Sequence, residues 1–182
     1  MIRRTIFPLF LLATMLAADP AGSQPAGVTV PLEKKARPAA GKGGVTGLPL
    51  PRFVSLRSGK VNLRTGPGSR YPVEWVLVYR HMPVEIIAEF DTWRKVRDWQ
   101  GTVGWIHQSM ISGRRWAIVR EGRQPLRRAA DAEARIVARI ERKVIGQIEQ
   151  CREGWCEIDF SGFKGWVRDK QVWGVYPGEK VD

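Results

Sequence analysis

The stretch Val61-Asn62-Leu63-Arg64-Thr65-Gly66-Pro67-Gly68 constrains the fold of this chain more than any other. Its apolar residues, Val61 and Leu63, alternate with polar ones, which is the period of a half-buried β-strand. Gly66-Pro67-Gly68 then predicts a tight turn, because glycine reaches backbone angles that other residues avoid and proline fixes φ. The stretch therefore predicts a short strand that ends in a turn.

More short strands are predicted on both sides of this turn. They cover Phe53–Leu56, Trp75–Tyr79, Val84–Ala88, Trp93–Arg97 and Gly104–Ile106, with turn sequences between them. The run from Trp75 to Tyr79 is apolar throughout, which predicts a strand with little solvent on either face. Several short strands at this spacing indicate a small β-barrel rather than a helical domain.

The second half of the chain repeats the first in degenerate form. Leu126-Arg127 corresponds to Leu63-Arg64, Trp155 to Trp93, and Gly165-Trp166-Val167 to Gly104-Trp105-Ile106. The second copy has Arg128-Ala129-Ala130-Asp131 where the Gly-Pro turn is expected. We therefore expect a second module of the same type with a different loop at this point.

The middle of the second copy gives conflicting signals. Ile136, Ile140, Val144 and Ile148 recur every four residues, and this pattern alone indicates an amphipathic helix. The repeat predicts strands instead. We favour strands, because Trp155 and Gly165-Trp166 keep their spacing and helix propensity is easily overridden by tertiary contacts.

These elements together resemble the bacterial SH3 domain (SH3b), a family of small β-barrels. The resemblance rests on a scaffold signature of ten residues: Asn62, Arg64, Gly66, Pro67, Trp93, Gly104, Trp105, Trp155, Gly165 and Trp166. The second copy, with Cys151 to Cys156 and Trp173-Gly174-Val175, is similar to SH3-like domains of exported Gram-negative proteins. The resemblance implies an all-β chain with two tandem barrels, at residues 52–113 and 114–178, the second degenerate.

The N-terminal residues predict export. Arg3 and Arg4 precede an apolar run from Ile6 to Leu16, and small residues follow, so we expect a signal peptide at 1–23. The run is too short to span a membrane, which takes about 20 residues. Residues 24–51 are rich in Pro, Gly and Ala and predict a disordered tether. The mature chain should lack a transmembrane segment and reside in the periplasm of a Gram-negative bacterium.

The strong positive charge indicates an anionic partner. The formal net charge is +12 and the pI about 10.4. Cell-wall polymers, lipid headgroups and nucleic acid all fit this balance, as does a merely solvated basic surface. Export argues against nucleic acid.

The sequence offers no catalytic or metal-binding constellation. Cys151 and Cys156 flank a predicted hairpin tip, and export places them in an oxidising compartment, so we expect a Cys151–Cys156 disulfide. His81 and His107 have no zinc-ligand spacing relative to each other or to the cysteines. No nucleophile has an evident activating partner. We therefore predict a protein that is not an enzyme and has no metal or cofactor.

The predicted activity is non-catalytic binding in the cell envelope. The family resemblance implies ligands such as peptidoglycan stem peptides or short segments of envelope proteins. The candidate groove combines aromatic and basic side chains, which suit peptide carboxylates: Tyr71, Trp99, Arg70, Arg94 and Arg97. The alternative is a periplasmic adaptor for protein–protein interaction, which a hydrophobic, conditionally exposed patch around Trp116 and Trp173 would favour. These two tryptophans would otherwise pack the modules together.

Overall fold

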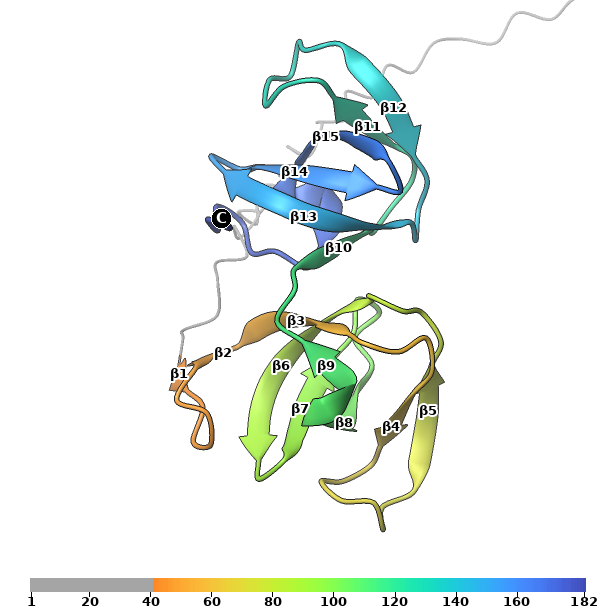
Figure 1. The fold of residues 1–182 in the computed structure, drawn as a ribbon, viewed down its shortest axis with the longest axis vertical. Coiled ribbons are helices and arrows are strands. Elements are labelled where there is room, and N and C mark those ends of the chain that lie inside the picture. The colour runs from red at the N-terminus through yellow and green to blue at the C-terminus, as the bar shows by residue number, and fades with distance from the viewer. Residues whose placement is uncertain (1–40) are drawn as a thin grey trace, which may run out of the picture. The chain divides into compact units, whose positions relative to one another are not determined.

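The computed structural model describes residues 41–182, which are almost entirely β-structure (Figure 1). Two short 3₁₀ helices, Gln108–Met110 and Asp169–Gln171, are the only helical elements within this range. The predicted signal peptide at 1–23 and the tether as far as residue 40 lie outside the described residues. The all-β prediction is confirmed.

The first barrel is one antiparallel sheet with the strand order β5-β4-β8-β7-β6-β3-β9. Its strands are β3 (Arg52–Leu56), β4 (Val61–Arg64), β5 (Val73–Leu77), β6 (Pro83–Phe90), β7 (Trp93–Arg97), β8 (Val103–His107) and β9 (Ile111–Ser112). The turn predicted at Gly66-Pro67-Gly68 lies in the loop that joins β4 to β5.

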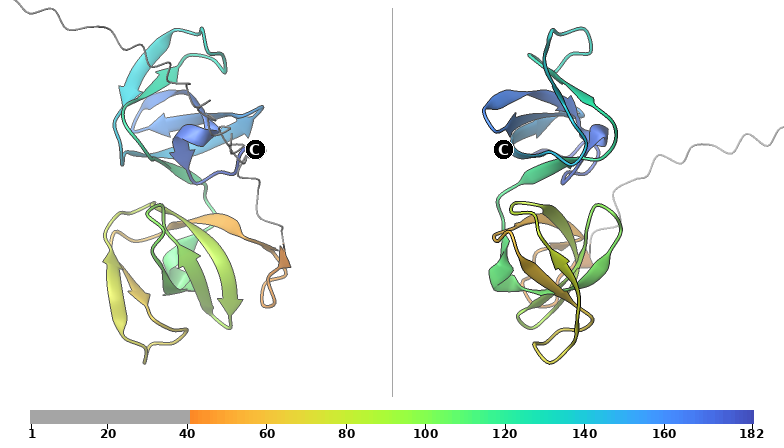
Figure 2. Two further views of the ribbon diagram at one scale, coloured as in Figure 1. Left: turned by 180° about the vertical axis from the view of Figure 1, so that it is seen from behind. Right: turned by 90° about the vertical axis from the view of Figure 1, so that its right-hand side faces the viewer.

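The second barrel repeats this topology with the order β12-β11-β15-β14-β13-β10-β16 (Figure 2). Its strands are β10 (Trp116–Val119), β11 (Gln124–Arg127), β12 (Ile136–Ile140), β13 (Ile145–Arg152), β14 (Trp155–Phe160), β15 (Phe163–Arg168) and β16 (Val172–Trp173). The region with conflicting signals is therefore β12 and β13, as the repeat predicted, and not a helix. The two tandem barrels are confirmed, while the precise domain ends stay predictions.

Each barrel closes around its own apolar core, and the Gly-Trp signature has a packing reason. A Cβ on Gly104 would lie 2.5 Å from Cγ of Leu63, and one on Gly165 would lie 2.8 Å from Cγ of Leu126. Both leucines are fully buried. Glycine is therefore needed in β8 and β15 so that the core leucine of the crossing strand can approach the backbone.

The repeated Arg64 and Arg127 hold equivalent loops. Arg64 Nη1 donates to the Tyr71 carbonyl oxygen at 2.6 Å, and Arg127 Nη1 donates to the Ala134 carbonyl oxygen at 2.7 Å. Each bond reaches seven residues along the chain. The arginine therefore serves the same purpose in both copies, although only the first copy has the Gly-Pro turn.

The prediction that Trp75–Tyr79 avoids solvent is wrong. β5 lies at one end of the first sheet and pairs only with β4. Trp75 is 57% exposed, and Val73 and Val76 are exposed as well. The apolar composition of this run therefore does not indicate burial or a central position in the sheet, because an edge strand can also carry exposed apolar side chains.

The predicted tether ends earlier than expected. Within it, β1 (Gly41–Lys42) and β2 (Pro49–Leu50) pair as an antiparallel hairpin. The carboxylate of Glu89 on β6 anchors the hairpin: it accepts from Thr46 N at 2.9 Å and Thr46 Oγ1 at 2.7 Å, and it pairs with Arg52 Nη2 at 2.7 Å. Burial alone raises the pKa of Glu89, but the bonds from Thr46 and Arg52 outweigh it and lower the pKa to about 2.

The predicted disulfide is confirmed. Cys151 on β13 and Cys156 on β14 are register partners close to the tip of the hairpin, and their sulfur atoms are bonded. Both residues are buried in the second core. The tip between them turns through Glu153 and Gly154, which both have positive φ.

Candidate binding site

Two of the predicted groove arginines are structural. Arg94 is only 3% exposed, and its guanidinium donates to the carbonyl oxygens of Asp91 at 2.7 Å and Trp93 at 2.9 Å and to Gln108 Oε1 at 2.8 Å. Its donors hold the β6–β7 turn onto the segment after β8. These bonds occupy Nη1 and Nη2 of the guanidinium inside the fold, and the ligand-binding role of Arg94 stays a prediction.

Arg97 forms an ion pair inside the fold. Its Nε donates to Glu85 Oε2 at 2.9 Å, and Nη2 contacts the same oxygen. Glu85 is 2% exposed and also accepts from the Tyr176 hydroxyl at 2.8 Å. Because Tyr176 follows β16 of the second barrel, Glu85 links the two barrels, and the ligand-binding role of Arg97 stays a prediction.

Arg70 and Tyr71 lie together, away from the other predicted residues. The Arg70 guanidinium carbon is 5.3 Å from the centre of the Tyr71 ring. The ring rests on Gly66, where a Cβ would collide with it. No hydrogen bond, ion pair or ring contact within residues 41–182 joins this pair to Trp99. The structure does not assemble the five predicted residues into one groove.

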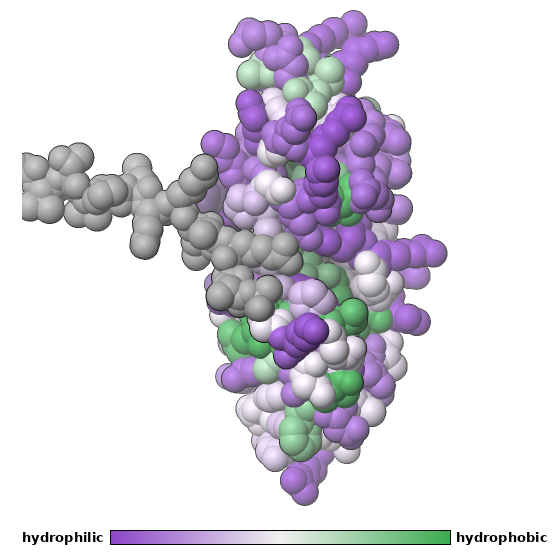
Figure 3. All heavy atoms as spheres, turned by 90° about the vertical axis from the view of Figure 1, so that its left-hand side faces the viewer, coloured by the Kyte–Doolittle hydropathy of each residue, from purple (hydrophilic) through white to green (hydrophobic). Residues whose placement is uncertain are grey.

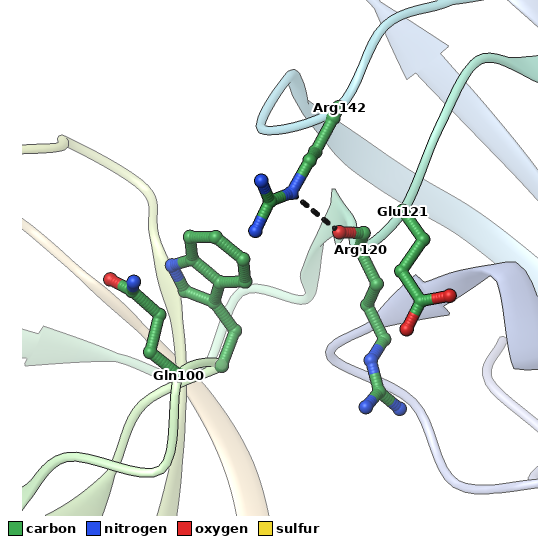
Figure 4. A pocket seen from close by; sticks show the side chains of 5 residues that line it. Gln100, Arg120, Glu121 and Arg142 are labelled. Carbon is green, nitrogen blue, oxygen red and sulfur yellow. Dashed lines mark hydrogen bonds between the residues drawn. The ribbon is translucent and has the colours of Figure 1, made fainter.

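Trp99 instead lines a pocket with residues of the second barrel. The pocket has a volume of about 290 Å³, and we call it the Trp99 pocket (Figure 4). It is lined by five residues: Trp99, Gln100, Arg120, Glu121 and Arg142. The volume is at the low end for small-molecule sites, which suits one chemical group rather than a whole large ligand.

Two arginines give the Trp99 pocket its chemistry. The Arg142 guanidinium carbon lies 5.4 Å from the Trp99 ring centre, and that of Arg120 lies 5.8 Å from the Trp173 ring centre. Arg142 Nε donates to the Arg120 carbonyl oxygen at 3.1 Å, which orients the side chain (Figure 4). Neither guanidinium forms an ion pair with a described acidic residue. The pocket can therefore accept a carboxylate.

Contacts between the barrels hold the two sides of the pocket. The His81 and Trp116 rings stack at 4.1 Å between centroids, and Phe53 meets Trp173 edge-on at 5.1 Å. Ser55 Oγ donates to the Arg114 carbonyl oxygen at 2.7 Å. Trp116 and Trp173 therefore contact the first module, as one of the two predictions for them had it, while the adaptor alternative stays a prediction.

Of the residues that line the Trp99 pocket, sequence reasoning named Trp99 but not Arg120 or Arg142. One signal was available: Arg142 follows β12 as Arg80 follows β5, so comparison of the two copies places a cation in equivalent loops. Figure 3 shows one face on which hydrophilic residues cover most of the second barrel and hydrophobic ones are more frequent over the first.

Residues 41–182 contain neither a cluster of metal-ligand side chains nor a long apolar helix. No three His, Cys, Asp or Glu side chains in this range are grouped so that they could hold a metal ion. The same range contains no helix with the length and apolar character that crossing a membrane requires.

The chain matches solved structures over about half of their own length. NlpC2 and NlpC1 from Trichomonas vaginalis share 12% identity with the chain, at TM-scores of 0.32 and 0.30, and matches cover 68% and 72% of the chain. An NlpC/P60 family protein from Bacillus cereus shares 10% identity over 69% of the chain, at a TM-score of 0.31. The matched regions cover 48%, 48% and 57% of those proteins.

The comparison with protein families gives the assignment. No curated protein matches the chain. The family model described as "Bacterial SH3 domain" matches twice, at residues 57–113 and 120–174, which together make up more than half of the chain. These ranges contain the repeated Arg64 and Arg127 and both Gly-Trp pairs. The chain therefore belongs to the bacterial SH3 domain family.

Proposed function

We propose that the chain is a non-catalytic binding module of the cell envelope that holds the carboxylate of a peptide in the Trp99 pocket. The observation that carries the proposal is the pair of arginines that line the pocket, Arg120 and Arg142, neither of which has a carboxylate partner among the described residues. A peptide carboxylate would accept from the guanidinium groups, and its apolar part would lie against Trp99. Peptidoglycan stem peptides and segments of envelope proteins both offer such a group.

The location belongs to the same proposal. The basic and apolar residues at the N-terminus support export to the periplasm, and the disulfide suits an oxidising compartment. Membership of the bacterial SH3 domain family supports a binding role rather than turnover. Among the described residues, those that line the Trp99 pocket do not include a nucleophile beside an activating base.

A binding assay with matched peptides tests the pocket. The mature chain, residues 24–182, would be titrated with a tripeptide that has a free terminal carboxylate and with its amide. We expect the amide to bind at least ~10-fold more weakly, because the lost charge-assisted bonds contribute about 1.5–3 kcal/mol. Muropeptides released from sacculi and peptides from envelope proteins would then separate the two sources of ligand.

Substitutions locate the site. Arg142→Ala should reduce carboxylate binding at least ~10-fold, and Arg142→Lys should restore only part of it because lysine cannot form the bidentate contact. Arg128→Ala is the matched control, since Arg128 is exposed, forms no ion pair within residues 41–182 and does not line the pocket. Equal losses in Arg142→Ala and Arg128→Ala, or equal binding of acid and amide, would show only general attraction to a basic surface.

A further inference from the structure

The outer edge of β5 is an open strand. Within residues 41–182, the first sheet ends at β5, and β4 is the only strand that pairs with it. On the side away from β4, the backbone N–H and C=O groups of Val73–Leu77 therefore have no neighbouring strand. Such an edge can template one more strand, and most proteins protect it with lysine, proline or a cover.

The side chains of this edge do not protect it. Val73, Trp75 and Val76 are exposed within the strand, and Val78 and Tyr79 are exposed just after it. No lysine or proline occurs between Val73 and Tyr79, and Glu74 is the only charged residue of the strand. Several exposed apolar side chains on an open edge are typical of an interaction surface.

Three cationic side chains that form no ion pair within residues 41–182 lie near the ends of β5. Arg70 lies three residues before β5 and Arg80 three residues after it, and both are exposed. Exposed Lys60 precedes Val61, the register partner of Leu77. None of the three forms an ion pair within residues 41–182. A ligand on this edge would therefore gain from negative charge.

From this combination we propose that the β5 edge binds an extended, acidic segment of a partner protein as an additional antiparallel strand. Only another peptide strand presents N–H and C=O groups at the spacing of the edge. A second copy of this chain fits poorly, because pairing β5 with β5 would bring Lys60, Arg70 and Arg80 of both copies together against two Glu74 carboxylates. The proposal goes beyond the Trp99 pocket and uses none of its residues.

The test uses the mature chain and a defined probe. The probe is a seven-residue peptide of alternating valine and aspartate, amidated at its C-terminus so that it lacks the terminal carboxylate expected in the Trp99 pocket. We expect binding that falls at least ~10-fold in Trp75→Lys, an exposed edge substitution that blocks strand addition. Phe163→Lys is the matched control, because Phe163 is an exposed apolar residue of the second barrel and the charge change is the same.

Four comparisons decide the outcome. Support requires that the probe keeps its affinity in Phe163→Lys and Arg142→Ala, and that N-methylation of alternate probe residues abolishes binding by removing backbone donors. Equal binding of the N-methylated probe would overturn strand addition. Equal losses of probe affinity in Trp75→Lys and Phe163→Lys would also overturn strand addition. Sedimentation that shows dimers of the parent chain but not of Trp75→Lys would assign the edge to a second copy instead.

Discussion

His81 combines a special backbone conformation with a ring contact between the barrels. Its φ of 65° places it in the left-handed region, and its imidazole stacks on Trp116 with the ring planes 5° apart. Burial lowers the pKa of His81, and the charges of Arg80 and Arg114 lower it further. The neutral ring is therefore the form that the folded protein prefers.

This preference predicts that acid weakens the fold near His81. Because the folded pKa lies below the unfolded value of about 6.5, the contribution of His81 is complete above that pH and is lost as pH falls through the folded pKa. The free energy of unfolding in urea should be lower at pH 5 than at pH 7.5, and this difference should be smaller in His81→Asn. Asparagine is chosen because it also tolerates positive φ. An unchanged pH dependence in His81→Asn would assign the decrease to other groups.

Gly104 supports a prediction about packing. Gly104→Ala should destabilise the first barrel by about 2–3 kcal/mol, because the new methyl group overlaps the buried Leu63 side chain. Denaturant unfolding measures the loss. Gly113→Ala is the control, since a Cβ there meets nothing within 4 Å. Equal stability of the two variants would mean that Leu63 moves away without cost.

At the scale of single residues, the sequence predicted the scaffold better than the candidate site. The Gly-Trp pairs recur in both copies, so they could be recognised from the repeat. Arg94 could not be judged in this way, because arginine is usually exposed and only the turn carbonyls at Asp91 and Trp93 show why this one is buried. Arg142 was missed because its partner Trp99 is 43 residues away in the sequence.

The hairpin of β1 and β2 depends on one carboxylate. Glu89→Gln should release it, because glutamine weakens the charge-assisted bonds from Thr46 and Arg52. Hydrogen exchange should increase at residues 43–48, while β6 and β7 stay protected. Glu74→Gln, at an exposed residue of β5, should leave the hairpin unchanged. Faster exchange at residues 43–48 in Glu74→Gln but not in Glu89→Gln would mean that Glu89 does not anchor the hairpin.

The contact with Glu89 also makes the stability of the β1–β2 hairpin depend on pH. The folded pKa of Glu89, about 2, lies below its unfolded value, so the stabilisation is complete above about pH 4.5 and is lost as pH falls towards 2. Sequence reasoning assigned residues 41–50 to the tether because proline and glycine are common in both linkers and turns. The anchor that distinguishes the two cases lies on a distant strand.

The disulfide closes a short loop and should stabilise the second barrel modestly. Replacing Cys151 and Cys156 together with serine should cost about 2 kcal/mol, because few residues lie between them and little chain entropy is removed from the unfolded state. Thermal unfolding under oxidising and reducing conditions measures this. The parent should lose stability on reduction, and the double variant should not respond. A response in both would point to an effect of the reductant itself.

Both edges of the repeat show why element type was easier to predict than burial. β5 and β12 are equivalent ends of the two sheets, and both expose apolar side chains: Val73, Trp75 and Val76 in one, Ile136 and Val137 in the other. Apolar content alone identifies each as a strand. Whether a strand lies at the centre or at the edge depends on pairing between distant segments, which local sequence does not specify.

At the scale of the whole described unit, the Trp99 pocket exists only while residues of both barrels stay together. Glu85 is central to that contact, because its buried carboxylate meets Arg97 of its own barrel and the Tyr176 hydroxyl from the end of the second. Buried carboxylates without partners are costly, so the three groups stabilise one arrangement. The site could not be predicted from either copy alone, since each supplies only part of its lining.

Glu85→Gln should therefore weaken carboxylate binding without touching the pocket. The amide keeps the shape of Glu85 but loses the ion pair to Arg97, and we expect a stability loss of about 2–3 kcal/mol and a measurable decrease in peptide affinity. Glu149→Gln is the matched control, because its exposed ion pair with Lys164 lies within the second barrel. Calorimetry should resolve separate unfolding of the barrels only in Glu85→Gln. Full affinity in that variant would show that the stacked rings of His81 and Trp116 hold the pocket without the buried carboxylate.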